Sequence, residues 1–183
     1  MDATKELARL TGAKTFIGEM DVPLLTGEKF HYPIRTFKPD VLLRDNDVVE
    51  LGNTSIKCIS TPGHTDGTMS FFFDVNDGEK MYRAGMLGGA GTNTLVKDFI
   101  EKHNVPLENR QKFLNSFDQV LTEKVDIFVG NHVVNNDTDK KIRLIDLSEV
   151  NPFINPSEWG TFLIERKERI MQIIKIMSSS NLV

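Results

Sequence analysis

Short apolar runs alternate with turn-forming residues through the middle of the chain, a pattern typical of a β-sheet. The runs cover residues 48–51, 54–60, 69–75 and 79–84. They are separated by Gly52-Asn53, by a Pro62-Gly63 loop and by residues 76–78, all of which favour turns. We therefore predict consecutive strands joined by short connections, with residues 126–130 as one more buried strand and residues 137–141 as a charged turn.

Apolar residues at helical spacing predict helices on either side of this stretch. The first helix carries Leu7 and Leu10 on one face. A second begins at Pro106, and a third begins at Asn155, with Glu158 in the capping-box position. The apolar stripes of these two helices are Leu107, Leu114, Phe117 and Leu121, and then Ile170, Ile173, Ile174 and Met177. Helices that cover a sheet have this pattern, so neither stripe needs a functional explanation.

Size and charge narrow the possible functions. The 183 residues fit one domain, 1–183, and neither a repeat nor a linker divides them. Hydrophobic residues make up 39% and charged residues 26% of the chain, as in an ordinary globular protein. The net charge of -4 argues against nucleic acid or an acidic membrane as the partner. The sequence has neither a long apolar span nor a signal-like start at Met1, and we expect a cytoplasmic protein.

The residues available for metal binding are few. Cys58 is the only cysteine, which excludes an internal disulfide and a four-cysteine zinc site. His64 lies in a Pro-Gly turn after one predicted strand, and His132 directly follows another, so two strand ends could bring both imidazoles to one ion. For His31 and His103 we expect structural roles. A catalytic zinc usually needs three protein ligands and a water, and these residues alone do not supply them.

The segment Thr61-Pro62-Gly63-His64-Thr65-Asp66-Gly67, followed by an apolar strand, resembles the third metal-binding motif of the metallo-β-lactamase superfamily. The resemblance extends along the whole chain and is nearest to the third subclass of zinc β-lactamases. It includes Tyr32-Pro33, the acidic turn and strand at 45–52, the helix and strand at 113–130 before His132, and Asn151-Pro152-Phe153-Ile154-Asn155-Pro156. It implies an α/β protein with an αβ/βα sandwich, and it implies that His64 and His132 are zinc ligands.

The chain departs from the family pattern in its metal ligands. Family members carry a His-X-His-X-Asp-His motif just upstream of the helix that corresponds to residues 3–10, and this sequence contains no His-X-His. We therefore expect the carboxy-terminal portion of a sandwich truncated at its amino end. Met86 stands where many members have an aspartate, and a thioether is a poor ligand for zinc at such a site. The complete family site holds two zinc ions and an activated water, so the resemblance implies little or no activity for this chain alone.

Two hypotheses follow. In the first, the chain is part of a zinc-dependent hydrolase that cleaves a lactam, lactone, ester or similar small molecule. In the second, it is a non-catalytic form of the fold that binds a ligand or protein and self-associates, as a homo-oligomer or by pairing with the missing amino-terminal segment.

Asp66 could hold a histidine tautomer or bond its own backbone. A phosphate cradle at residues 85–91 is disfavoured, since no P-loop or dinucleotide motif accompanies these glycines.

Overall fold

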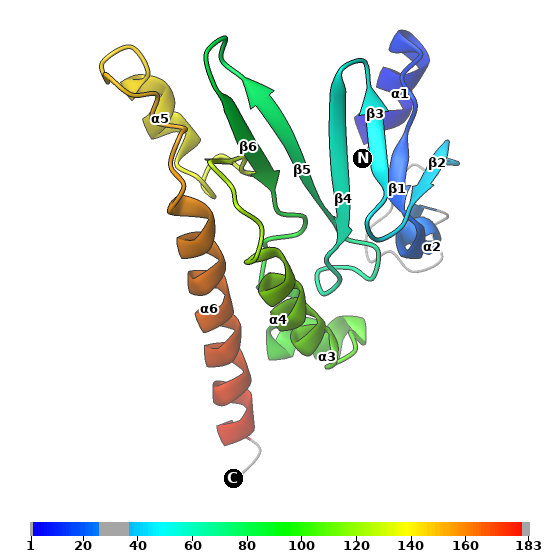
Figure 1. The fold of residues 1–183 in the computed structure, drawn as a ribbon. Coiled ribbons are helices and arrows are strands. Elements are labelled where there is room, and N and C mark those ends of the chain that lie inside the picture. The colour runs from blue at the N-terminus through cyan, green and yellow to red at the C-terminus, as the bar shows by residue number, and fades with distance from the viewer. Residues whose placement is uncertain (1, 26–36, 181–183) are drawn as a thin grey trace.

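The computed structural model describes residues 2–25 and 37–180, which form two β-sheets and their flanking helices (Figure 1). The strands are β1 (Phe16–Gly18), β2 (Val41–Leu43), β3 (Val48–Leu51), β4 (Thr54–Ser60), β5 (Met69–Asn76), β6 (Met81–Met86) and β7 (Ile127–Phe128). The helices are α1 (Asp2–Thr11), α2 (Val22–Leu25), α3 (Lys97–His103), α4 (Asn109–Val120), α5 (Thr138–Leu144) and α6 (Glu158–Ser180), with 3-10 turns η1 (Glu19–Asp21) and η2 (Asn93–Leu95). His31 and Tyr32-Pro33 lie outside the described residues. Across residues 2–25 and 37–180, no helix combines the length and apolarity needed to cross a bilayer.

The larger sheet has the strand order β3-β4-β5-β6-β7. Neighbouring strands from β3 to β6 are antiparallel, and β7 pairs parallel with β6. The bounds predicted for β3 and β4 are confirmed, and β6 lies two residues later than predicted. The smaller sheet is a parallel pair of β1 and β2. The apolar pattern did not reveal β2, because three residues are too few to show a period.

The main core lies between the larger sheet and the helices α4 and α6, which run along one side of it (Figure 1). Trp159 is its largest fully buried side chain. The indole Nε1 donates to the carbonyl of Val120 at 3.0 Å, and the ring meets Phe72 and Phe128 edge-on at centroid distances of 5.6 and 5.5 Å. The predicted stripe on α6 is confirmed for Ile170 and Ile173, which are buried.

A smaller core on the other face contains Cys58, Leu43 and Met69. Cys58 is completely buried in it, and burial raises the pKa of its thiol. A thiolate nucleophile needs access and a lowered pKa. The interpretation of Cys58 as a small core residue is therefore confirmed.

The helix predicted to begin at Pro106 begins instead at Asn109. Pro106 and Leu107 form a tight turn, whose carbonyls accept from the amides of Asn109 and Arg110 at 3.1 and 3.2 Å. The buried face of α4 consists of Asn109, Arg110, Phe113, Ser116, Phe117 and Val120. The predicted stripe was wrong at Leu107, which precedes the helix, and at Leu121, which follows it, because both side chains are exposed. Helix α3 was not predicted.

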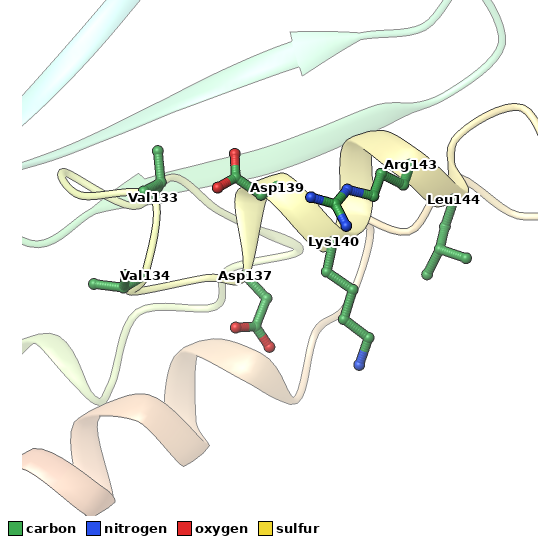
Figure 2. Close-up of a pocket in the computed structure, with 7 residues that line it drawn as sticks. All are labelled: Val133, Val134, Asp137, Asp139, Lys140, Arg143 and Leu144. Carbon is green, nitrogen blue, oxygen red and sulfur yellow. The ribbon is translucent and has the colours of Figure 1, made fainter.

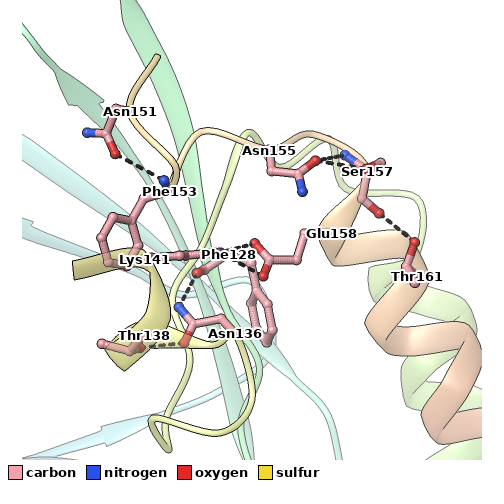
Figure 3. A network of polar contacts seen from close by, with 10 residues as sticks. All are labelled: Phe128, Asn136, Thr138, Lys141, Asn151, Phe153, Asn155, Ser157, Glu158 and Thr161. Carbon is pink, nitrogen blue, oxygen red and sulfur yellow. Dashed lines mark hydrogen bonds and ion pairs between the residues drawn. The ribbon is translucent and has the colours of Figure 1, made fainter. Parts of the chain in front are cut away.

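A polar network joins α5 to the start of α6 (Figure 3). Asn155 caps α6 as predicted, because its Oδ1 accepts from the backbone N–H of Ser157 at 3.2 Å. Glu158, however, does not complete a capping box: its carboxylate pairs with Lys141 at 2.6 and 2.5 Å. The amide of Asn155 donates instead to the carbonyl of Asp126 at 2.8 Å. The charged turn predicted at 137–141 was wrong, since α5 begins there and provides Lys141.

Candidate metal centre

The topology brings several loops to one edge of the larger sheet. Strands β4, β6 and β7 all run in the same direction, because β5 is antiparallel to both β4 and β6 and β7 is parallel to β6. Their carboxyl ends therefore lie at the same edge. The loop that carries His64 follows β4, a glycine-rich loop follows β6, and His132 lies beyond β7. Both histidines are exposed.

The loop that carries His64 is closed by its own backbone and hydroxyl groups. The amide of Thr61 donates to the carbonyl of Thr68 at 2.8 Å, and the amide of Gly63 donates to the carbonyl of Thr65 at 3.0 Å. Gly63 has a φ of 141°, and a Cβ there would lie 2.6 Å from Cδ2 of Phe113. Only glycine fits this position, which explains why Gly63 precedes His64.

The glycine-rich loop after β6 passes directly against His64. A Cβ on Gly89 would lie 2.4 Å from the Cβ of His64, and Gly89 has a φ of 58°. A Cβ on Gly88 would lie 2.1 Å from the carbonyl oxygen of Met69. On another side, the ring of Phe113 meets the imidazole edge-on at a centroid distance of 6.5 Å. Close packing against His64 therefore explains Gly89, and close packing against Met69 explains Gly88, without a phosphate.

Helix α4 fixes the same loop through two polar contacts. The hydroxyl of Ser116 donates to the carbonyl of Pro62 at 2.7 Å. The ammonium of Lys112 donates to Asp66 at 2.8 Å, and this hydrogen bond raises the pKa of Lys112. The carboxylate of Asp66 is thus directed to α4, and neither role considered for it from the sequence is observed.

Asp21, at the end of η1, contacts the loop from the opposite side. Its Oδ1 accepts from the amide of Gly67 at 2.8 Å and its Oδ2 from the hydroxyl of Thr65 at 2.6 Å. Burial of the carboxyl raises the pKa of Asp21, although these two hydrogen bonds act in the opposite direction. Sequence reasoning missed this residue, because 44 positions separate it from Thr65 and no local pattern connects them.

The turn that carries His132 is held by Asn136. Its Nδ2 donates to the carbonyl of Phe128, the last residue of β7, at 2.9 Å (Figure 3). A Cβ on Gly130 would lie 2.7 Å from Oδ1 of Asn136, so the backbone packs tightly just before His132. The carbonyl of His132 accepts from the amide of Asn135 at 2.9 Å. The backbone that presents His132 is therefore well ordered by local contacts.

The lining of a surface hollow of about 450 Å³ includes Val133, the residue that follows His132 (Figure 2). The hollow is lined by Val133, Val134, Asp137, Asp139, Lys140, Arg143 and Leu144. Figure 2 shows that the side chains of Asp137 and Lys140 point to one side of α5, whereas those of Val133 and Asp139 point to the other. The charged groups diverge, and His64 is not part of the lining. The hollow is therefore a neighbour of the candidate site and not its centre.

The donor set does not fit a complete zinc site. Within residues 2–25 and 37–180, no three His, Cys, Asp or Glu side chains lie close enough together to hold a metal ion. Met86 ends β6 at the same sheet edge, but its thioether is poorly suited to zinc. His103 packs its ring against Phe99, with a centroid distance of 4.3 Å, as expected of a structural residue.

The fold has clear counterparts among solved structures. BJP-1, a subclass B3 metallo-β-lactamase of Bradyrhizobium japonicum, superposes with a TM-score of 0.86 and 24% identity, over 98% of this chain and 70% of that chain. LRA-12, a class B3 di-zinc metallo-β-lactamase from an Alaskan soil metagenome, gives a TM-score of 0.78 and 24% identity, over 93% of this chain and 67% of that chain. The chain therefore has the metallo-β-lactamase fold, and the predicted α/β class and resemblance are confirmed.

Comparisons at the level of sequence are shorter. No known family model matches the chain. A hydroxyacylglutathione hydrolase of Francisella tularensis subsp. novicida is 36% identical over 56 residues, which amount to 28% of this chain and 22% of that protein. The match thus covers less than a quarter of this curated relative.

Proposed function

We propose that this chain supplies two metal ligands, His64 and His132, to a zinc-dependent hydrolase of the metallo-β-lactamase fold. The observation that carries the proposal is the loop around His64. Close contacts explain the two glycines of the motif, Gly63 and Gly67. The loop is fixed from three sides by Asp21, Phe113 and Gly89. A loop built in this way presents an exposed imidazole in a defined direction, which a metal ligand requires.

We further propose that the chain on its own has little or no hydrolase activity. A catalytic zinc needs three protein ligands and an open position for water. Two histidines do not fix such a position, and the sequence contains no His-X-His that would complete it. We therefore assign no hydrolytic step to this chain alone. The further ligands would come from a segment with the His-X-His-X-Asp-His motif.

The proposed substrate of the complete site is a small molecule with a lactam, lactone, ester or related bond. The similar solved structures are β-lactamases, and the sequence relative is a hydroxyacylglutathione hydrolase. The fold supports many hydrolytic reactions, so the bond that is cleaved has to be found by assay.

A complementation assay tests this function. The full chain is incubated with zinc and a chromogenic lactam, with or without a synthetic segment that carries His-X-His-X-Asp-His. We expect no turnover above background for the chain alone, and measurable turnover when the segment is added. The matched controls are a segment whose motif histidines are alanine and the His64→Ala chain, both of which should stay inactive. Chelator-sensitive turnover by the unaided chain, lost in His64→Ala, would contradict the proposal.

A second candidate function is self-association of the chain, favoured by apolar residues on its amino-terminal elements. Leu7 and Leu10 of α1 are 58% and 63% exposed although they form the apolar face of an amphipathic helix. Phe16 and Leu42, on the small parallel sheet, are also exposed. A two-stranded sheet is only marginally stable in water and has open edges. We propose that a second copy of the chain covers this side.

Sedimentation velocity over a dilution series tests the association. We expect dimers or larger species that dissociate on dilution, and we expect the Leu7→Lys/Leu10→Lys variant to shift towards monomer. Leu147→Lys, which changes an exposed leucine far along the chain, is the control and should leave association unchanged. A wild-type chain that remains monomeric at the highest concentration would exclude this candidate function.

A further inference from the structure

We infer that Asp21 is a positioning residue for His64, because its carboxylate holds the part of the loop that follows the histidine. The inference rests on the proposed role of His64 as a metal ligand. Oδ1 and Oδ2 of Asp21 accept from Gly67 and Thr65 at 2.8 and 2.6 Å, so the residues just after His64 are bound to η1. Asp21 therefore acts on His64 through the Gly67 amide and the Thr65 hydroxyl of the loop.

The contacts of Asp21 complete a set that approaches the loop from different elements. Helix α4 contacts the start of the loop through Ser116, and the ring of Phe113 faces His64. The loop after β6 contacts His64 through Gly89. These contacts act at or before the histidine. After it, Lys112 of α4 holds the side chain of Asp66, and Asp21 holds the Gly67 amide and the Thr65 hydroxyl. Loss of the Asp21 contacts should therefore loosen the part of the turn after His64 and let the imidazole shift against Phe113 and Gly89.

The backbone around Asp21 is packed too closely against the loop for an incidental contact. A Cβ on Gly67 would lie 2.4 Å from the backbone nitrogen of Asp21, and a Cβ on Gly18 would lie 1.9 Å from the carbonyl oxygen of Gly67. Glycine is required at both positions, because any side chain would separate the two segments. The end of β1 and η1 are thus docked on the His64 loop, and Asp21 supplies the polar contacts of this junction.

The hydrogen-bond pattern predicts which substitutions preserve the junction. The hydroxyl of Thr65 also lies 2.6 Å from that of Thr68. An asparagine at position 21 can therefore accept from Gly67 through Oδ1 and donate through Nδ2 to Thr65, whose own proton then goes to Thr68. An alanine can do neither. Asp21→Ala should release the loop, and Asp21→Asn should largely restore it.

Asp40 provides a matched control within the same part of the chain. Its carboxylate accepts from the amide and the hydroxyl of Thr15 at 2.7 and 2.8 Å, which is the same chemistry as at Asp21. Thr15 precedes β1 and does not belong to the His64 loop. Asp40→Ala should therefore weaken the amino-terminal elements without moving His64.

NMR of the full-length variants tests the inference without any metal. In Asp21→Ala we expect amide exchange at Gly67 to accelerate at least about tenfold, as expected when a protecting hydrogen bond opens locally. Nuclear Overhauser contacts of the His64 ring with Phe113 and Gly89 should weaken in the same variant. Asp21→Asn should stay close to wild type, and Asp40→Ala should change exchange near Thr15 only. Should Asp21→Ala fail to fold, Thr65→Val removes the hydroxyl contact alone, and the contacts of the His64 ring with Phe113 and Gly89 should still weaken in it.

Unchanged exchange at Gly67 together with unchanged His64 contacts in Asp21→Ala would overturn the inference. Equal effects of Asp40→Ala on the His64 ring would also overturn it, because general loosening would then explain the result.

A zinc titration of the same variants separates the two proposals. If His64 is a ligand, Asp21→Ala should bind zinc about tenfold more weakly, as is typical when a supporting contact of a ligand is lost. NMR changes without zinc binding in the wild type would support the positioning role and contradict the proposed function.

Discussion

Replacing Gly89 by alanine should destabilise the protein by about 2–5 kcal/mol and displace His64. Two physical costs add up at this position. Gly89 has a φ of 58°, where an L-residue with a side chain costs about 1–2 kcal/mol. The new methyl group would also lie 2.4 Å from the Cβ of His64, and such overpacking adds about 1–3 kcal/mol. Urea unfolding measures the loss, and the His64 ring resonances report its displacement.

Gly52 allows the two costs to be separated. It has a φ of 62°, close to that of Gly89, but a Cβ there meets nothing within 4 Å. Gly52→Ala should therefore cost only the backbone strain of about 1–2 kcal/mol and leave His64 in place. Equal destabilisation by the two substitutions, with His64 unmoved in both, would show that the glycine-rich loop does not pack against the histidine as described.

The parts of the fold that the sequence predicted are those specified by neighbouring residues. Strands β3 and β4 were predicted with correct bounds, since Gly52-Asn53 forms the turn between them and apolar residues mark both strands. The loop around His64 was found because residues 61–67 resemble a known metal-binding motif, and in the structure close contacts require the glycines at 63 and 67. The N-cap of α6 at Asn155 is equally local.

The parts that were missed depend on contacts between distant residues. Glu158 has the sequence position of a capping-box residue, but the nearby Lys141 of α5 pairs with it instead. The side chains of this pair are only 10% and 18% exposed, so a charge-assisted bond outweighs the local cap. Asp21 was missed for the same reason, because its partners Thr65 and Gly67 reach it only through the fold.

The largest effect on metal binding is expected from His64→Ala and His132→Ala. If the two imidazoles share an ion at the common edge of the sheet, removal of either leaves a single ligand. A lone exposed imidazole does not retain zinc, so each substitution should abolish detectable binding in a zinc titration of the full chain. His103→Ala is the matched control, since His103 lies in α3 with its ring against Phe99, and it should bind zinc like the wild type. Undiminished zinc binding in both single variants would exclude them as the ligands.

The number of zinc ions that the purified chain holds by itself shows whether this polypeptide contributes only part of a metal centre. Elemental analysis after exhaustive dialysis against metal-free buffer gives this number. We predict that the wild-type chain retains no zinc under these conditions and binds it only while zinc is supplied. Two zinc ions per chain that survive dialysis would show instead that the chain holds a complete dinuclear site with its own side chains.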